Sequence, residues 1–350
     1  IVFQGRDTGK PVVVQPAETD AQIAALNDRV TDLEQTLTKL NGQNETITFE
    51  LGKANKAAAE QEARADALEQ RLAAIEKTLA DRRRAGLDGL VGGLATVVIN
   101  VAPDDLLPAA EELLATTGLR FETALDDPLT GDGSPAILLR DGMGADFCVK
   151  SRASGAPNPF VPYNGGAKTG QTVAGRLETF VFTCTDLERY VAIQRERGVS
   201  FLTPAPLVTE TFSFIQTVPS AHTGNSLGFV QWRDQPGAYR HGGSRTLALA
   251  PVKPERPWHD RISGLDHVAT RVHAQNRDAA ITEFLALTNY HFDFAVYVES
   301  LNSITNVARL GVGDYAQVFT SGIMPAGGQD DAGPTEGFIR NYGLRPHHMA

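Results

Sequence analysis

Cysteine is scarce in this sequence, because the 350 residues include only two, Cys148 and Cys184. Two cysteines cannot build a disulfide framework, and their spacing matches no zinc-binding motif. Each of them lies within an apolar run of the sequence. We therefore expect two buried and unreactive thiols.

Long apolar runs and an excess of positive charge are also missing. The most apolar stretch, residues 89–102, is rich in glycine and shorter than the roughly 20 residues that a membrane-spanning helix needs. Lys and Arg number 32 against 42 Asp and Glu, which gives a net charge of −10. A protein that binds nucleic acid presents a basic face to it, so we expect no nucleic-acid partner.

The composition that remains, with 42% hydrophobic and 21% charged residues, is typical of a globular protein. Its length exceeds that of one ordinary core and predicts at least two domains. Residues 1–20 begin with three apolar residues and continue as a polar, proline-containing stretch, which we interpret as an extended segment. This segment could follow a signal or membrane segment, and the protein would then be tethered to a membrane. A soluble enzyme without such a segment would be cytoplasmic.

A heptad pattern of apolar residues predicts a long coiled-coil helix over residues 21–84. One apolar seam consists of Ile23, Val30, Leu37, Leu51, Leu72 and Leu79, and the other consists of Leu26, Leu33, Leu40, Ile47, Leu68 and Ile75. Asn44 occupies a seam position, where a buried amide fixes the register and favours two strands. We therefore expect a homo-oligomer, most simply a parallel dimer. A helical hairpin that folds back on its own domain is the alternative.

Beyond the predicted helix, the sequence repeats a βαβββ order. Residues 95–102 predict a strand, a helix ending at Gly118 follows, and three short strand-like runs complete the first unit. The same order recurs over residues 177–233, and a third unit begins at Gly264. The final residues, 345–350, would open a fourth unit. Internal repetition of this kind predicts an α+β protein built from repeated units.

The repeats also suggest domain boundaries. Residues 90–233 would form a first domain of two units, and residues 261–350 would form a second domain. Residues 234–260 between them are rich in proline and glycine, which predicts an interdomain linker.

Three short sequences after residue 262 carry a resemblance to a known family. They are Gly264–Val268 (GLDHV), Ser300–Ser303 (SLNS) and the run from Phe338 to the closing HHMA. In this order they resemble the first metal-ligand strand, the substrate-facing segment and the second ligand strand of the vicinal oxygen chelate superfamily. Within it, the chain resembles 4-hydroxyphenylpyruvate dioxygenase and its relatives over about residues 90–350. The resemblance implies units paired into half-open barrels, and it leaves out the coiled coil.

The resemblance implies a metal site formed by His267 and His348, which would open paired units and point into one barrel. Neighbouring side chains of a strand point to opposite faces, so His347 and His348 cannot both be ligands through the same face. The resemblance selects His348. It also implies a carboxylate ligand late in the fourth unit, past Ala350, so that the second domain is expected to be truncated. Such a ligand set suits non-haem Fe(II), and we expect Fe(II) or another divalent metal.

The resemblance further implies that Asn302, Ser303 and His347 face a small-molecule substrate, a 2-oxo acid or an aromatic compound. Several positions depart from the family pattern. His347 and Glu336 stand where the family has glutamines, and residues 320–322 replace a substrate-facing amide. These departures remove groups that hold 4-hydroxyphenylpyruvate, so the substrate and any further catalytic residue stay unidentified.

Three functions remain open from the sequence. We favour a metal-dependent, dioxygenase-like oxidoreductase. The alternatives are a non-catalytic scaffold that oligomerises or anchors through its coiled coil, and a metal-dependent lyase or isomerase with additional carboxylate ligands. The strands of the first domain carry Asn100 but no histidine, so we expect that half to bind no metal. Five histidines show no ligand spacing and are expected to be surface, loop or structural residues: His222, His241, His259, His273 and His291.

Overall fold

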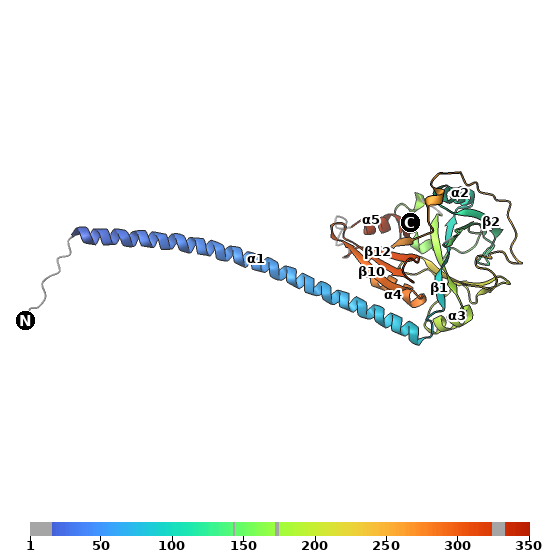
Figure 1. Ribbon diagram of the computed structural model, residues 1–350, viewed down its shortest axis with the longest axis horizontal. Coiled ribbons are helices and arrows are strands. Elements are labelled where there is room, and N and C mark those ends of the chain that lie inside the picture. Colours follow the sequence, from blue (N-terminus) through green and yellow to red (C-terminus); the bar gives the residue numbers. More distant parts are fainter. Residues whose placement is uncertain (1–15, 143, 172–174, 324–332) are drawn as a thin grey trace, which may run out of the picture. The chain divides into compact units, whose positions relative to one another are not determined.

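The computed structural model describes residues 16–142, 144–171, 175–323 and 333–350 (Figure 1). It divides into two compact units, which meet between Gln70 and Arg71. We call them the helical unit, up to Gln70, and the globular unit, from Arg71 to Ala350. The boundary lies inside helix α1 (Pro16–Arg84), so this one helix contributes to both units.

Helix α1 is continuous through Gly42 and Gly52, the two residues that most weaken its heptad pattern. Its seam side chains in the helical unit are exposed, for example Leu26 at 63% and Leu33 at 62%. Apolar stripes of this kind are normally covered by another surface in water. The described part of the helical unit therefore presents an uncovered apolar stripe.

The last turns of α1 belong to the globular unit and pack on it. The Arg71 guanidinium pairs with Asp278 at 2.7 Å, and Ile75 is buried in a core cluster. Arg82 is also buried and donates hydrogen bonds to carbonyl oxygens at the end of a later helix, those of Leu285, Thr288 and Tyr290. A cation there satisfies carbonyl groups that a helix end leaves without partners.

The first βαβββ unit has the predicted order. It consists of β1 (Val91–Val101), α2 (Leu106–Thr116), β2 (Arg120–Asp126), β3 (Pro135–Arg140) and β4 (Asp146–Ser151). The buried residues of α2 recur every four positions, which turns one face of the helix towards the sheet.

The second unit consists of β5 (Arg176–Cys184), α3 (Leu187–Glu196), β6 (Leu207–Val208), β7 (Phe212–Gln216) and β8 (Ser226–Trp232). Helix α3 begins at Asp186, whose side chain accepts a hydrogen bond from the backbone N–H of Arg189. Asp is a favoured residue at this position because it satisfies a free N–H group of the first turn.

One strand of the second unit differs from the sequence expectation. The run from Val199 to Pro204 forms only an isolated bridge, between Phe201 and Thr217, and the two-residue strand β6 follows it. Pro204 and Pro206 explain the difference, because proline has no N–H to donate to a neighbouring strand.

The third unit consists of β9 (His267–Arg271), α4 (Arg277–Leu287), β10 (His291–Val298), β11 (Ser303–Arg309) and β12 (Ala316–Ser321). All four strands and the helix were expected from the sequence.

Helix α5 (Pro334–Tyr342) and strand β13 (Pro346–Met349) follow the third unit, and the helix was not expected. It ends at Gly343, whose φ of 76° favours glycine. A side chain at Gly343 would collide with the carbonyl oxygen of Tyr163 in the first domain. This close approach fixes the chain just before it enters β13.

The strands form two sheets that repeat one arrangement. The larger sheet has the order β2-β3-β4-β1-β5-β8-β7-β6, and the smaller has the order β10-β11-β12-β9-β13. In both, the first strand of a unit pairs in parallel with the last, and in antiparallel with the strand that opens the next unit. This arrangement confirms the predicted α+β architecture of paired βαβββ units.

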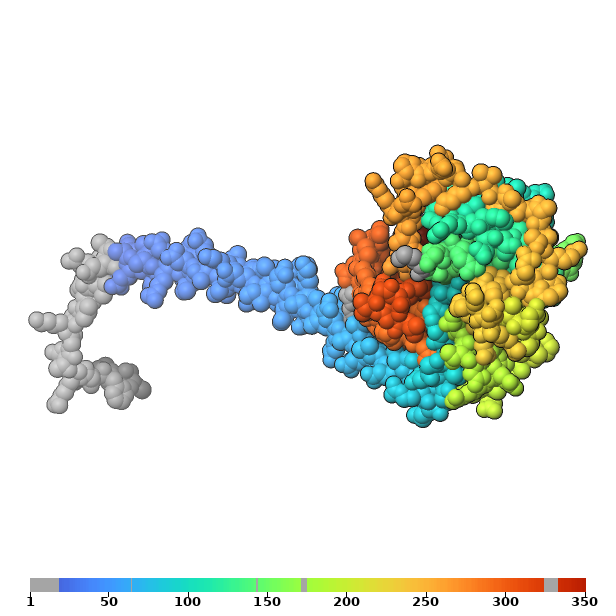
Figure 2. All heavy atoms as spheres, turned by 45° about the vertical axis from the view of Figure 1, so that its right-hand side comes forward, coloured from blue at the N-terminus to red at the C-terminus, as the bar shows by residue number. Residues whose placement is uncertain are grey.

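Residues 90–233 and 261–350, predicted as two domains and still called the first and second domain below, share a hydrophobic core within the one globular unit. It contains aromatic residues of both, including Phe182 and Tyr190 from the first and Phe284 and Tyr290 from the second. Residues 234–260, predicted as a linker, lie along the first domain (Figure 2), where Tyr239 is buried. None of the described helices meets the length and apolarity that a membrane-spanning segment requires.

Candidate functional site

His267 and His348 lie on neighbouring strands and on the same face of the smaller sheet. Strands β9 and β13 are antiparallel, and His348 lies opposite Ala269. Side chains two residues apart on a strand share a face, so His267 lies on the face of Ala269 and His348. The register therefore brings together two residues that are far apart in the sequence.

The two imidazole rings face each other through their Nε2 atoms. Nε2 of His267 is 3.0 Å from Nε2 of His348, and the ring planes are nearly perpendicular, at 84°. Two neutral imidazoles with their lone pairs turned towards each other repel, so a proton or a cation has to lie between them. Metal–nitrogen bonds of about 2.1 Å at a right angle would separate two nitrogens by about 3 Å. The observed distance fits a pair of metal ligands.

The outer nitrogen of each ring is also bonded. Nδ1 of His267 is 2.8 Å from Oδ2 of Asp266, and Nδ1 of His348 is 2.8 Å from Nε2 of His347. Nδ1 of His347 in turn lies 3.0 Å from the carbonyl oxygen of Ala269. If every Nδ1 carries the proton, each outer contact is a hydrogen bond and both Nε2 atoms stay free for a ligand. Partners of this kind orient histidine ligands in metal sites.

Burial and nearby positive charge favour the neutral forms of His347 and His348. Burial lowers the pKa of His347 to about 4, with a further contribution from the positive charge of Arg271. Burial also lowers the pKa of His348, with His267 and Arg271 acting in the same direction. A metal binds only the neutral imidazole, so at neutral pH no proton has to be removed from His348 before a metal binds.

His267 and His348 are the two candidate metal ligands at this position. Among the residues that the structure describes, no group of three His, Cys, Asp or Glu side chains could hold a metal ion. His267 and His348 would therefore supply two ligands and leave the other positions to water, to a substrate or to a further ligand. Asp266 is exposed, at 58% of its side-chain area, and its carboxylate contacts the far side of the His267 ring.

The face that carries the histidines is otherwise largely apolar. Strand register places Val318, Val307 and Phe294 in one row across β12, β11 and β10, level with Ala269. Val296 and Val298 continue the row along β10, and these edge residues are exposed, Phe294 at 44%. An exposed apolar surface beside the two histidines could hold the apolar body of a small molecule.

The residues predicted to face the substrate lie in different environments. Ser303 begins β11 opposite Val298, which places it on the face of the histidines. Asn302 has a left-handed φ of 43°, and its Oδ1 accepts a hydrogen bond from the N–H of Ile323, as in a tight turn. His347 contacts the back of the His348 ring.

The equivalent positions of the first domain hold hydroxyl groups. Thr96 pairs with the first residue of β4, as His267 does with that of β12, and Thr179 lies opposite Val98 on the neighbouring strand. The Thr96 hydroxyl is 2.7 Å from that of Tyr239, and Thr179 donates to Gln216 at 3.0 Å. The first domain therefore presents two engaged threonines where the second presents two histidines.

Two residues of the site were missed by sequence reasoning. Asp266 immediately precedes His267, and a carboxylate beside a ligand histidine is a signal that the sequence offered. Arg271 follows four residues later on β9, on the same face, and donates to the Thr335 hydroxyl. No pattern in the sequence indicated that α5, which carries Thr335, packs against this strand.

Comparison with solved structures identifies the fold. The chain is similar to a triple mutant of 4-hydroxymandelate synthase from Streptomyces coelicolor, with 17% identity, a TM-score of 0.51 and coverage of 74% of this chain and 70% of that one. A xylose isomerase-like TIM barrel/4-hydroxyphenylpyruvate dioxygenase fusion protein matches with 12% identity, a TM-score of 0.45 and coverage of 74% and 36%. Methylmalonyl-CoA epimerase from Mycobacterium tuberculosis matches with 20% identity, a TM-score of 0.32 and coverage of 41% and 89%.

No protein-family model matches the sequence, and no curated protein sequence matches it. The structural similarity to the synthase confirms the expected fold of paired βαβββ units. Identity this low establishes the architecture only.

Proposed function

We propose that this protein is a metal-dependent, dioxygenase-like enzyme in which His267 and His348 bind a divalent metal, with Fe(II) the first candidate. The observation that carries the proposal is the 3.0 Å separation of the two Nε2 atoms, which converge from different strands. The partners behind each ring support it, because Asp266 and His347 would hold the two imidazoles in the tautomer that a metal needs.

A bound Fe(II) ion would supply open coordination positions for a chelating substrate and for O₂. The chain's own residues would hold the histidine rings in place. The carboxylate of Asp266 would accept a hydrogen bond from Nδ1–H of His267, and the carbonyl oxygen of Ala269 would accept one from Nδ1–H of His347. These hydrogen bonds would keep both ligand rings fixed while substrate enters.

We propose that the substrate is a small anionic molecule with an apolar or aromatic body, such as a 2-oxo acid. Arg271 lies on the face of the histidines, and its buried Nε has no hydrogen-bond partner among the described residues. A carboxylate could pair with the guanidinium charge of Arg271 and be held close to the two histidines. The apolar row of β10 to β12 would then contact the rest of the molecule, and Ser303 would contribute a hydroxyl at its edge.

The test is oxygen consumption by the protein after anaerobic loading with Fe(II). A panel of 2-oxo acids with aromatic and aliphatic side chains would be compared with the corresponding acids that lack the oxo group. We expect uptake of O₂ only with a subset of the 2-oxo acids, and loss of uptake in the His267→Ala variant. Uptake that is equal in that variant, or is absent with every 2-oxo acid, would contradict the proposal.

A non-catalytic scaffold is the second candidate, and two observations favour it. The described residues provide no third protein ligand for a metal, and the helical unit presents an uncovered apolar stripe. In such a scaffold, the helical unit would mediate assembly, and the globular unit would catalyse no reaction. A lyase or isomerase would need further carboxylate ligands, for which the described part of the chain offers no cluster.

In either case we propose that the helical unit self-associates. A second copy of the same helix offers a matching apolar stripe, and Asn44 would pair with its counterpart in a parallel dimer. The segment available for this is shorter than the 21–84 range expected from the sequence, because the helix beyond Arg71 packs on its own globular unit.

A further inference from the structure

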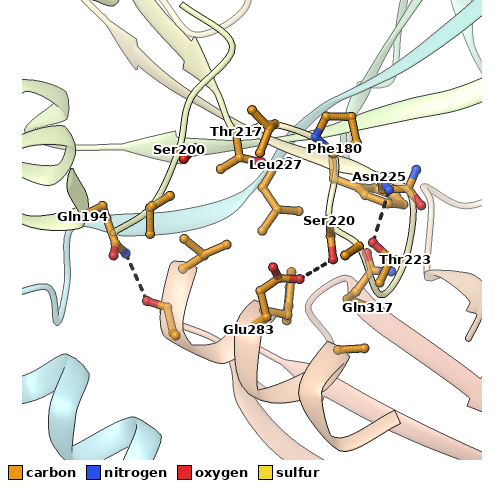
Figure 3. Close-up of a pocket in the computed structure, with 18 of the residues that line it drawn as sticks. Phe180, Gln194, Ser200, Thr217, Ser220, Thr223, Asn225, Leu227, Glu283 and Gln317 are labelled. Atoms are coloured by element: carbon orange, nitrogen blue, oxygen red, sulfur yellow. Dashed lines mark hydrogen bonds between the residues drawn. The ribbon is translucent and has the colours of Figure 1, made fainter. Parts of the chain in front are cut away.

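A cavity of about 450 Å³ lies in the globular unit between the two domains (Figure 3). Helix α3 and the loop between β7 and β8 form its walls on the side of the first domain, and α4 and β12 form those of the second. Its volume is in the range of sites that hold small molecules.

This cavity is separate from the candidate metal site. Thr270 and Gln317 line it, and they alternate along β9 and β12 with His267, Ala269 and Ala316, which lie on the other face of the sheet. A ligand in the cavity would therefore contact the sheet from the side opposite the two histidines.

Glu283 supplies the negative charge of the cavity. It extends from α4 towards Ser220, whose hydroxyl donates a hydrogen bond to Oε2 of the carboxylate (Figure 3). No basic side chain pairs with Glu283 among the residues that the structure describes. Arg197 is the other charged residue of the lining, and it is exposed, so water and salt weaken its influence inside.

Two further acceptors in the lining lack a donor. Oε1 of Gln194 and Oδ1 of Asn225 are buried and have no hydrogen-bond partner among the described residues. Both side chains are more than nine-tenths buried, at 1% and 3% exposed. Buried acceptors without a partner are unfavourable, so the walls of the cavity favour a ligand that donates hydrogen bonds over one that brings further acceptors.

The rest of the lining is apolar and includes Phe180, Leu227, Phe284 and Phe319. We infer that the cavity binds a small primary amine, with its ammonium group at the carboxylate of Glu283 and its apolar body against these side chains. An ammonium group has three donors and no acceptor, which matches a lining whose carboxylate has no basic partner among the described residues. This site is independent of the function proposed above.

The experiment uses three probes of equal length and different head group: n-butylammonium, n-butanol and butyrate. Binding would be followed by chemical-shift changes of backbone amides in the ¹⁵N-labelled protein. We expect n-butylammonium to shift resonances of Ser220, Thr223 and Glu283 in a saturable manner, butanol to bind at least tenfold more weakly, and butyrate to leave these resonances unchanged.

Glu283→Gln is the decisive variant, because it removes the charge and keeps an oxygen that can accept from Ser220. We expect it to weaken n-butylammonium binding at least tenfold, while Glu188→Gln, on the exposed part of α3, leaves binding unchanged. The His267→Ala variant should bind the probe as the unaltered protein does, which separates this site from the metal site. Equal binding to the Glu283→Gln variant, equal binding of butyrate, or no saturable shift at the cavity would overturn the inference.

Discussion

Arg176 begins β5, and Arg345 immediately precedes the equivalent strand β13. Both donate a hydrogen bond to the same atom, Oδ1 of Asn164, at 3.1 and 2.6 Å. The two guanidinium groups are close enough that burial and the charge of Arg345 lower the pKa of Arg176 to about 10. A single amide oxygen thus accepts from both arginines, one in each domain.

We predict that Asn164→Ala destabilises the globular unit by about 1–3 kcal/mol, because it leaves two buried cations without their shared acceptor. Asn164→Asp should be at least as stable as the unaltered protein at neutral pH, since a carboxylate would face both guanidinium groups. Urea denaturation of the three proteins measures the effect. An Asn164→Asp variant as unstable as Asn164→Ala would argue against this role.

The pair His273 and Glu336 predicts a pH dependence of stability. Nδ1 of His273 is 2.8 Å from Oε2 of Glu336, and this hydrogen bond raises the pKa of the histidine and lowers that of the carboxyl. The contribution of a raised histidine pKa is complete below the ordinary value of 6.5 and is lost as pH rises through the raised value. The contribution of a lowered carboxyl pKa is present above 4.5 and is lost as pH falls through the lowered value.

The pair should therefore stabilise the fold most between about pH 4.5 and 6.5. We expect Glu336→Gln to lower the free energy of unfolding in this window by no more than about 1 kcal/mol, because both groups are partly exposed and screened. The difference from the unaltered protein should shrink as pH rises above the raised histidine pKa. Denaturation midpoints measured at several pH values test this, and a difference that is constant from pH 5 to 9 would be inconsistent with the assigned pair.

The apolar stripe of the helical unit predicts self-association. Leu33→Glu together with Leu40→Glu should convert the dimer to monomer, because charges at seam positions cannot be buried against a second helix. Gln35→Glu with Thr38→Glu is the matched control, since it adds the same charge outside the seam. Molar mass from light scattering distinguishes the outcomes, and a seam variant with the same mass as the control would exclude this interface.

Arg271 predicts the charge preference of the candidate site. Arg271→Gln should weaken the binding of a 2-oxo acid about tenfold to a hundredfold, because it removes a hydrogen-bonding charge that is worth about 1.5–3 kcal/mol. Arg309→Gln is a suitable control, because Arg309 lies on the same face of the sheet and forms an ion pair with Asp293. Isothermal titration of a 2-oxo acid checks this, and equal affinity for the two variants would remove Arg271 from the site.

Local patterns in the sequence were sufficient for much of the architecture. The heptads specify α1, and the apolar runs between Gly and Pro specify most strands of the three units. Alternation along a strand showed only that His347 and His348 point to opposite faces, and it was the family resemblance that selected His348 as the partner of His267. Pro204 and Pro206 could have indicated that the expected strand from Val199 to Pro204 is interrupted, but the βαβββ repeat favoured a strand there.

Other features depend on contacts between distant segments. Helix α5 is short and is held by partners such as Arg271 and His273, which precede it by more than 60 residues. The approach of His267 to His348 and the contact of His347 with the carbonyl oxygen of Ala269 arise only once β9 and β13 are in register. The cavity around Glu283 is formed by both domains, so no single stretch of sequence could have revealed it.

Metal titration tests the central claim most directly. Co(II), a spectroscopically visible substitute for Fe(II), would be added to the metal-free protein and to three variants: His267→Ala, His348→Ala and His291→Ala. The last is the control, because His291 is exposed on β10 and belongs to no candidate site. We predict one Co(II) per chain in the unaltered protein and in the control, with at least tenfold weaker binding in each of the other two variants. Equal Co(II) binding by all four proteins, or no binding by the unaltered one, would contradict a metal site at His267 and His348.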